Sequence, residues 1–241
     1  MGVFRFKRFE VVNERSAMKV NTDGVLLGAA MTVRPDDRNL LDIGTGTGTI
    51  ALMAAQRLEG QSSLNIHAVD IDEASATEAG ENFRNSPWAD NLTVHHASLD
   101  EFASEDAGRK YDMIFSNPPY FEDSLNAPEE RRNNARHTST GLSYREIIEF
   151  AAERLTEDGR LALVLPADTE NALCRYARMN GMHLFRMLRV KTVPRKDPSR
   201  IIAEFSKVRQ DSVEEDVLII QNEGKYTQEY LSLIQDFYLF A

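Results

Sequence analysis

The chain has 241 residues, of which 42% are hydrophobic and 27% charged, a composition typical of a soluble globular protein. No apolar run is long enough to cross a bilayer and the first residues lack a signal-peptide pattern, so we expect a cytoplasmic protein. Cys174 is the single cysteine, which excludes an internal disulfide and a zinc site built on paired cysteines. The formal net charge of −10 argues against nucleic-acid binding unless the basic residues are clustered.

The basic residues do cluster, in three parts of the chain. They are Arg5, Lys7, Arg8, Arg15 and Lys19; then Arg131, Arg132, Arg136 and His137; then Arg186, Arg189, Lys191, Arg195, Lys196 and Arg200. A solvated face explains any one of these clusters. All three clusters flank the candidate site at Asn117-Pro118-Pro119-Tyr120. A partner that carries many negative charges, such as a nucleic acid, is therefore still possible.

The first 38 residues are predicted to form an N-terminal extension that packs on a core of residues 39–241. Within it, FRFKRFEVVNERSAMKV (residues 4–20) alternates as a strand does. The next segment, NTDGVLLGAAM (residues 21–31), fits a short helix that Asn21, Thr22 or Asp23 could cap.

From residue 39 onward, short apolar runs alternate with helical patterns, which predicts an α/β fold with a mostly parallel sheet and helices on both faces. We expect seven strands, at residues 40–43, 65–70, 92–95, 112–116, 160–165, 183–190 and 201–205. Helices fit residues 48–58, 73–84, 143–155 and 169–180, with Ser143 as an N-cap and Gly159 as a C-terminal glycine.

The end of the chain departs from this alternation. The last two predicted strands lack a helical pattern between them, so they should form an antiparallel hairpin that closes the sheet. Residues 216–220 could add a further strand, and residues 227–240 fit an amphipathic helix.

The stretch LLDIGTGTGTI places Gly44, Gly46 and Gly48 between an apolar strand and a helix, where a ligand can lie against the backbone. A dinucleotide-binding fold would have its third glycine at Thr49, which disfavours a nicotinamide dehydrogenase. Asp42 is placed to face a cation or an ammonium, and Asp70, at the end of the next strand, to accept ribose hydroxyls.

Each of these residues also has an ordinary structural explanation. Glycine turns after strands are common, a strand-end aspartate can be solvated, and Asp72 is more readily explained as a helix N-cap than as a ligand. Their order and spacing together nevertheless predict a site for S-adenosyl-L-methionine.

The next strand ends in Asn117-Pro118-Pro119-Tyr120. The side-chain oxygen of Asn117 and the carbonyl of Pro118 can accept both hydrogens of a planar amino group, which aims the nitrogen lone pair at a sulfonium methyl. Tyr120 offers a flat face on which a planar substrate can stack. The competing explanation is a rigid turn with Tyr120 as core filler.

The motifs DIGTGTG, AVDID and SNPPY, in that order, resemble the class I S-adenosylmethionine-dependent amino methyltransferases, which have a Rossmann-like fold. The segments FKRFEVVNERSAMKVNTDGVLLGA, NSPWADNLTV, NPPYF, ARHT and FYLFA extend the resemblance to the bacterial tRNA1(Val) adenine-N6 methyltransferases along nearly the whole chain. The resemblance implies methyl transfer to N6 of adenine 37 in the anticodon loop, with tRNA as partner and no metal.

The same resemblance implies roles for individual residues. Those implied to bind the cofactor are Asp42, Gly44, Gly46, Gly48, Asp70, Ser98, Lys19, Thr22 and Asp23; those implied to hold the adenine are Asn117, Pro118, Pro119 and Tyr120; and Phe121, Arg136 and His137 are implied to contact the substrate. Helix capping explains Thr22 and Asp23 equally well, and a solvated loop explains Arg136 and His137.

Two positions depart from the family pattern. Ser98 stands where relatives often have an acid that contacts the adenine of the cofactor, and Ala30 replaces a frequent tryptophan. Two other classes of function stay open: a methyltransferase with another acceptor (a protein glutamine, rRNA or DNA), and a cofactor-binding module without activity.

Overall fold

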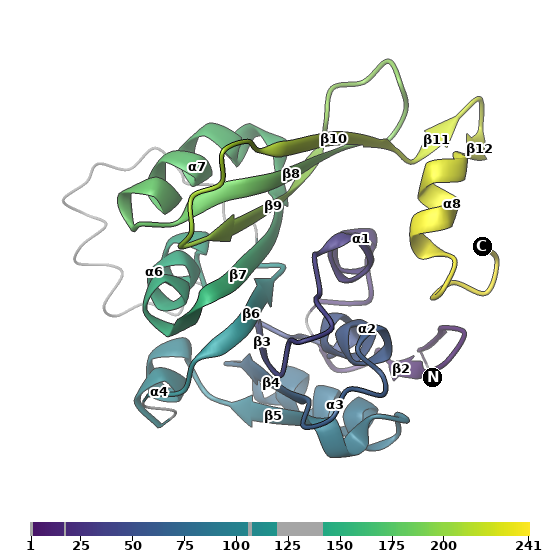
Figure 1. Ribbon diagram of the computed structural model, residues 1–241. Helices are drawn as coiled ribbons and strands as arrows, with labels where there is room; N and C mark the ends of the chain where they lie inside the picture. The colour runs from purple at the N-terminus through teal and green to yellow at the C-terminus, as the bar shows by residue number, and fades with distance from the viewer. Residues whose placement is uncertain (1, 17, 106–107, 120–141) are drawn as a thin grey trace, which may run out of the picture.

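The computed structural model describes residues 2–16, 18–105, 108–119 and 142–241. An eight-stranded sheet crosses the centre of the molecule, with helices on both faces (Figure 1). The α/β class and the Rossmann-like arrangement predicted from the sequence are therefore confirmed.

The strands of this sheet lie in the order β10-β8-β9-β7-β6-β3-β4-β5. Their bounds are β3 Asn39–Ile43, β4 Asn65–Asp70, β5 Leu92–His96, β6 Tyr111–Ser116, β7 Leu155–Pro166, β8 His183–Lys191, β9 Arg200–Ser206 and β10 Glu214–Ile219. Only β9 runs antiparallel to its neighbours, β7 and β8. All other pairs in the sheet are parallel.

Seven helices flank the sheet in the described part of the chain. They are α1 Thr22–Ala30, α2 Thr49–Arg57, α3 Glu73–Arg84, α4 Leu99–Glu105, α6 Tyr144–Arg154, α7 Glu170–Met179 and α8 Gln228–Ile234. One buried apolar cluster joins the sheet to α1, α2, α3 and α8, and a second joins it to α4, α6 and α7. Because both faces are covered, the central strands β3 and β6 are almost entirely buried.

The C-terminal half contains the expected hairpin and the further strand that residues 216–220 could add, whereas the predicted length of the last helix is wrong. The predicted hairpin of β8 and β9 forms, but β9 lies between β7 and β8, and β10 pairs in parallel with β8 to make an eighth strand at the edge. Helix α8 ends at Ile234, six residues before the predicted end.

Gly159 does not end a helix. Helix α6 stops at Arg154, and Gly159 lies inside β7, at the bulge opposite Tyr111 and Met113. A Cβ added at Gly159 would lie 2.9 Å from the carbonyl oxygen of Tyr111, so glycine is needed there for close approach of two strands.

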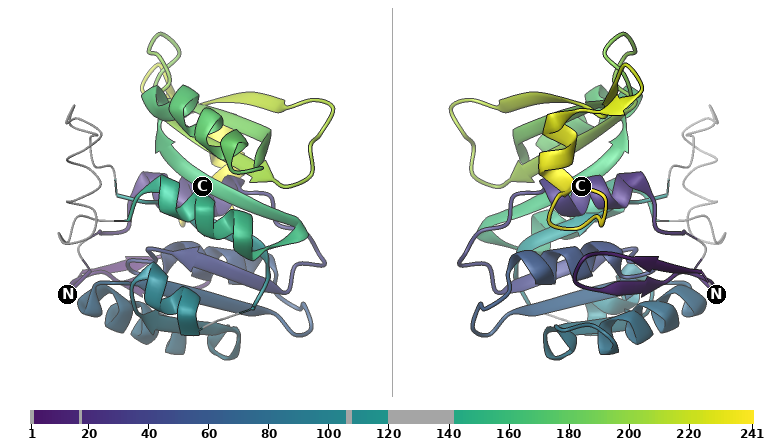
Figure 2. Two further views of the ribbon diagram at one scale, coloured as in Figure 1. Left: turned by 90° about the vertical axis from the view of Figure 1, so that its left-hand side faces the viewer. Right: turned by 90° about the vertical axis from the view of Figure 1, so that its right-hand side faces the viewer.

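The N-terminal residues form a hairpin, β1 Val3–Arg5 with β2 Glu10–Val12, which lies near α3 and the C-terminus (Figure 2). Phe6 and Phe9 stack with ring centroids 4.5 Å apart, and both join the apolar cluster under α1 and α2. A second small hairpin, β11 Gln221–Asn222 with β12 Lys225–Tyr226, precedes α8. None of the helices in the described ranges is long and apolar enough to span a membrane.

Candidate active site

Asp42, the glycine loop, Asp70 and Asn117, all singled out from the sequence, lie at one edge of the sheet. Strands β6, β3 and β4 are parallel neighbours, so their carboxyl ends lie together. Asp42 and the glycine loop belong to the end of β3, Asp70 ends β4, and Asn117 directly follows β6. In an open α/β sheet this edge is where ligands bind.

The glycine loop follows β3 in a left-handed backbone conformation, with φ of 70° at Gly44, 56° at Gly46 and 79° at Gly48. The N–H of Gly44 donates to the carbonyl of Val69 at 2.9 Å, which ties the loop to the end of β4. Gly48 caps α2, and a Cβ there would lie 2.5 Å from the Phe83 ring. Gly48 therefore permits the packing of α3 on the loop, while its predicted contact with the cofactor stays a prediction.

Asp42 is fully buried at the base of this loop. Its Oδ2 accepts a hydrogen bond from the Thr45 hydroxyl at 2.7 Å, whereas Oδ1 has no partner among the residues that the structure describes. Burial raises the pKa of Asp42 to about 7, against the opposing effect of the Thr45 hydrogen bond, and the nearby charge of Asp70 adds to the rise. A buried carboxylate with an unpaired oxygen is suited to a positively charged ligand group.

Asp70 holds the glycine loop from the neighbouring strand. Its Oδ2 accepts from the N–H of Gly46 at 2.8 Å, and its Oδ1 from the N–H of Asp72 at 2.9 Å. Burial raises the pKa of Asp70, and these two hydrogen bonds partly offset the rise. Asp72 accepts from the N–H of Ser75 at 2.8 Å, so its interpretation as the N-cap of α3 is confirmed.

Asn117 is 6% exposed and follows Ser116, whose hydroxyl donates to the carbonyl of Ile43 at 2.6 Å. This bond ties the end of β6 to the end of β3. The side-chain Nδ2 of Asn117 lies 3.5 Å from the sulfur of Met18 and donates to it. Pro118 is buried and Pro119 half-buried, while Tyr120, Phe121, Arg136 and His137 lie outside the described residues.

Residues 15–174 match the family model of the methyltransferase small domain. A tRNA1(Val) (adenine(37)-N6)-methyltransferase from Bacteroides fragilis is 40% identical over 236 residues, which is 98% of this chain and 97% of the relative. This chain belongs to the tRNA1(Val) (adenine(37)-N6)-methyltransferase family.

Solved structures extend the likeness in fold to more distant methyltransferases. A protein from Agrobacterium tumefaciens described as a predicted O-methyltransferase superposes with a TM-score of 0.66 at 15% identity, over 89% of this chain and 96% of that one. A protein from Listeria monocytogenes assigned to the class I S-adenosylmethionine-dependent methyltransferases superposes with a TM-score of 0.57 at 16% identity, over 88% and 68%.

The residues at the carboxyl edge fit the cofactor of such a methyltransferase, S-adenosyl-L-methionine. The partnerless Oδ1 of Asp42 suits the ammonium of its methionine part, and the positive-φ glycines leave backbone open for close approach. Asp70 is anchored by two backbone N–H groups, which would hold its carboxylate in place for ribose hydroxyls. In the described part of this methyltransferase, no three His, Cys, Asp or Glu side chains come close enough to hold a metal ion.

Three of four further predicted cofactor residues have hydrogen-bond partners within the protein, and the fourth begins a helix. Lys19 donates to the carbonyl of Glu14 at 2.6 Å, and the Oδ2 of Asp23 accepts from Arg200 at 2.8 Å. Thr22 is the first residue of α1, whose N-cap is Asn21. The backbone N–H of Ser98 donates to the Glu101 carboxylate at 2.9 Å, and the N–H of Glu101 donates to the Ser98 hydroxyl at 3.2 Å, which is a capping box for α4. Their roles toward the cofactor stay predictions.

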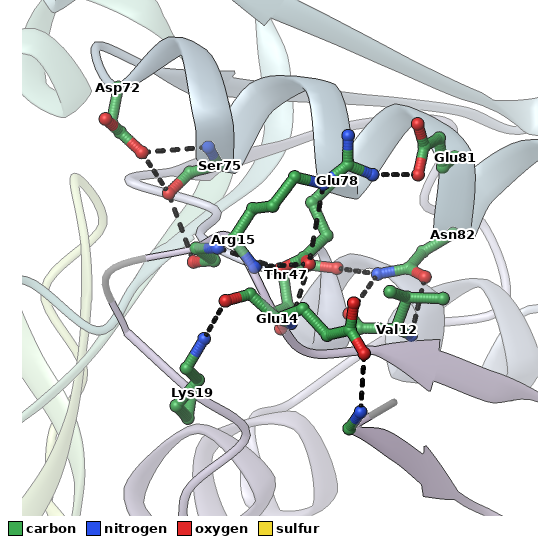
Figure 3. Close-up of polar contacts among 12 residues, drawn as sticks. Val12, Glu14, Arg15, Lys19, Thr47, Asp72, Ser75, Glu78, Glu81 and Asn82 are labelled. Carbon is green, nitrogen blue, oxygen red and sulfur yellow. Dashed lines mark hydrogen bonds and ion pairs between the residues drawn. The ribbon is translucent and has the colours of Figure 1, made fainter.

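Sequence reasoning missed a buried polar stripe on α3, formed by Ser75, Glu78 and Asn82 (Figure 3). It fastens a segment that we call the N-terminal strap, residues 12–16 and 18–20, to the glycine loop. Asn82 bonds both backbone groups of Val12, at 2.8 and 3.0 Å, and donates to the carbonyl of Thr47 at 2.9 Å.

Glu78 is the centre of the stripe and is fully buried. Its carboxylate accepts from the backbone N–H groups of Glu14, Arg15 and Ser16, at 2.7, 2.8 and 3.0 Å. Burial alone would raise the pKa of Glu78. The three hydrogen bonds outweigh this effect and lower the pKa below its usual value. The spacing of 75, 78 and 82 places all three polar residues on one helix face, and this was the available sequence signal.

Most arginines of the first and third basic clusters are paired with acidic side chains. Ion pairs join Arg5 to Glu10, Arg8 to Glu59, Arg15 to Glu78 and Glu81, Arg186 to Glu204 and Glu214, Arg189 to Glu170 and Glu215, and Arg200 to Asp23. Arg195 and Lys196 remain exposed in the connection between β8 and β9. The segment that contains Arg131, Arg132, Arg136 and His137 lies outside the described residues.

Proposed function

We propose that this protein transfers a methyl group from S-adenosyl-L-methionine to N6 of adenine 37 in tRNA1(Val). The observation that carries the proposal is the buried amide of Asn117 at the carboxyl end of β6, beside the glycine loop of β3. The acceptor follows from the relatives, which are named for that reaction and match nearly the whole chain. A tRNA acceptor also favours action in the cytoplasm.

In this proposal, Asn117 and Pro118 orient the target amino group. The amide oxygen of Asn117 and the carbonyl of Pro118 accept its two hydrogens, which directs the nitrogen lone pair toward the methyl group to be transferred. When bound, the cofactor supplies an electrophilic methyl group on a positively charged sulfur. A strong base is unnecessary, because the amino proton becomes acidic once the nitrogen carries the methyl group.

Burial of the site supports this role for Asn117. At 6% exposure, little water competes for its amide, so its hydrogen bonds to a substrate are worth more than they would be in solution. An adenine in an anticodon loop is already poorly stacked, which lowers the cost of turning it into such a pocket. Tyr120 would then stack on the base.

The test is transfer of tritium from labelled S-adenosyl-L-methionine to tRNA that lacks N6-methylation at position 37, followed by nucleoside analysis. We expect label in N6-methyladenosine with the unmodified protein. Asn117→Ala should keep cofactor affinity and lose most of the transfer, whereas Asn85→Ala, at an exposed asparagine that ends α3, should keep both. Label on a release factor or rRNA instead of tRNA would refute the proposed acceptor and support another amino group.

We also propose that Arg195 and Lys196 contact the tRNA backbone. Strand β8 is antiparallel to β9, β9 is antiparallel to β7, and β7 is parallel to β6. The connection after β8 therefore lies at the same sheet edge as Asn117. Reversing both charges should weaken tRNA binding and reduce the salt slope of log K by about 0.7–0.9 per lost phosphate contact.

The matched control for this experiment is Arg178→Glu. Arg178 is exposed near the end of α7, which precedes β8 and therefore lies at the opposite sheet edge. Unchanged binding and salt slope in the doubly reversed variant would remove this connection from the tRNA interface.

A further inference from the structure

The N-terminal strap reaches the active site at Met18. The hydroxyl of Ser16 donates to the carbonyl of Met18 at 3.1 Å, and a Cβ at Gly46 would lie 3.7 Å from that carbonyl oxygen. The sulfur of Met18 accepts from Nδ2 of Asn117 at 3.5 Å. Met18 thus lies between the glycine loop and the residue proposed to orient the substrate.

The chemistry of this contact distinguishes the two ends of the Asn117 amide. A primary amide has a donor end, Nδ2, and an acceptor end, Oδ1, which have nearly the same shape. A thioether sulfur accepts weakly and cannot donate. The sulfur therefore favours the amide orientation in which Nδ2 faces Met18 and Oδ1 faces away from it.

We propose that Met18 is a positioning residue whose thioether sets the orientation of the Asn117 amide, so that Oδ1 is the end presented to the substrate amino group. The proposal rests on the proposed function of Asn117. It adds a residue of the N-terminal strap, 99 positions away in the chain, to the determinants of the reaction.

Glu78 is the anchor that places Met18. Its carboxylate binds the three consecutive N–H groups of residues 14–16, and Ser75 donates to the hydroxyl of Ser16 at 3.1 Å. Ser16 in turn bonds the Met18 carbonyl. A continuous chain of hydrogen bonds therefore leads from α3 to Met18. Removing the Glu78 carboxylate should displace the Met18 sulfur and so lower the rate of methyl transfer.

The first test replaces the sulfur and keeps the apolar bulk. Met18→Leu should lower kcat/KM for tRNA by up to about twofold, because without the hydrogen bond the two amide orientations become equally populated. The dissociation constant of S-adenosyl-L-methionine should not change, because the amide does not bind the cofactor in this scheme. Met182→Leu, at a methionine 1% exposed in the other apolar cluster, is the control and should change neither quantity.

A spectroscopic measurement reads the contact without any turnover. The side-chain NH2 signal of Asn117, assigned as the one lost in Asn117→Ala, should shift in 15N–1H spectra of Met18→Leu and not of Met182→Leu. An unmoved signal, or a loss of cofactor affinity as large as the loss of transfer, would overturn the proposal.

The second test asks whether Glu78 acts through Met18. In Glu78→Gln one acceptor oxygen becomes an NH2 group facing backbone donors, so transfer should fall. The double variant with Met18→Leu should lose no more than the worse single variant, because both changes remove one effect. Losses that multiply would show that Glu78 does not act through Met18.

These readouts separate the inference from the proposed function. If the unmodified protein transfers no methyl group to tRNA, the proposed acceptor fails, while the NH2 shift still reports whether Met18 orients the amide. If transfer occurs but Met18→Leu matches the unmodified protein in both rate and spectrum, the inference alone fails.

Discussion

Lowering the pH should weaken cofactor binding through Asp42. With a pKa of about 7, Asp42 is protonated in roughly ten of eleven unliganded molecules at pH 6 and roughly one of four at pH 7.5. A ligand ammonium favours the carboxylate, so the proton must leave when the cofactor binds. The carboxylate fraction rises about eightfold from pH 6 to pH 7.5, and the apparent dissociation constant should fall by that factor.

Isothermal titration calorimetry in buffers of different ionisation enthalpy measures both quantities. Binding of S-adenosyl-L-methionine at pH 6 should release about 0.9 protons, the fraction of Asp42 that carries one. Asp42→Asn should bind weakly with no proton release. 5′-Methylthioadenosine lacks the ammonium, so its affinity should not follow this pH dependence. A pH-independent dissociation constant for the unmodified protein would refute the role of Asp42.

Two further predictions concern stability and are read from urea unfolding. Gly48→Ala forces a left-handed residue and places a Cβ against Phe83, so it should cost about 2–4 kcal/mol, and Phe83→Leu in the same chain should restore part of that. Asp37→Asn leaves the buried guanidinium of Arg160 without the carboxylate 2.5 Å away, at a cost of about 3–5 kcal/mol. Adding Arg160→Met to Asp37→Asn should recover much of the lost stability. Equal urea midpoints for Asp37→Asn and the unmodified protein would contradict a stabilising role of Asp37 toward Arg160.

The fold was largely predictable because apolar periodicity marks strands and helices that bury one face or both. The bounds of β4 and α3 match the predicted ones to the residue. Gly159 was predicted to end a helix because a glycine often follows the last turn of one. In the structure glycine is required there by the close carbonyl of Tyr111, which lies 48 positions away in the sequence. Helix α4 was not predicted, although Ser98 and Glu101 have the spacing of a capping box at its start.

The site was predictable only where residues act locally. The glycine loop and Asn117 follow strands, so their place at the sheet edge comes from topology. The partners of Glu78 lie 62 to 64 positions away, and Arg200 is 177 positions from its partner Asp23. Pairings at such separations depend on the packed structure, and composition or periodicity cannot reveal them.

The contact between the N-terminal hairpin and the end of the chain has a consequence for biosynthesis. Lys7 donates to the carbonyls of Gln235 and Ala241, and Phe6 bridges to Tyr238. During translation the hairpin leaves the ribosome before these partners do. The hairpin therefore completes these contacts only after residues 235–241 have left the ribosome, and a ribosome that stops before residue 235 releases a chain in which Phe6 and Lys7 lack these partners.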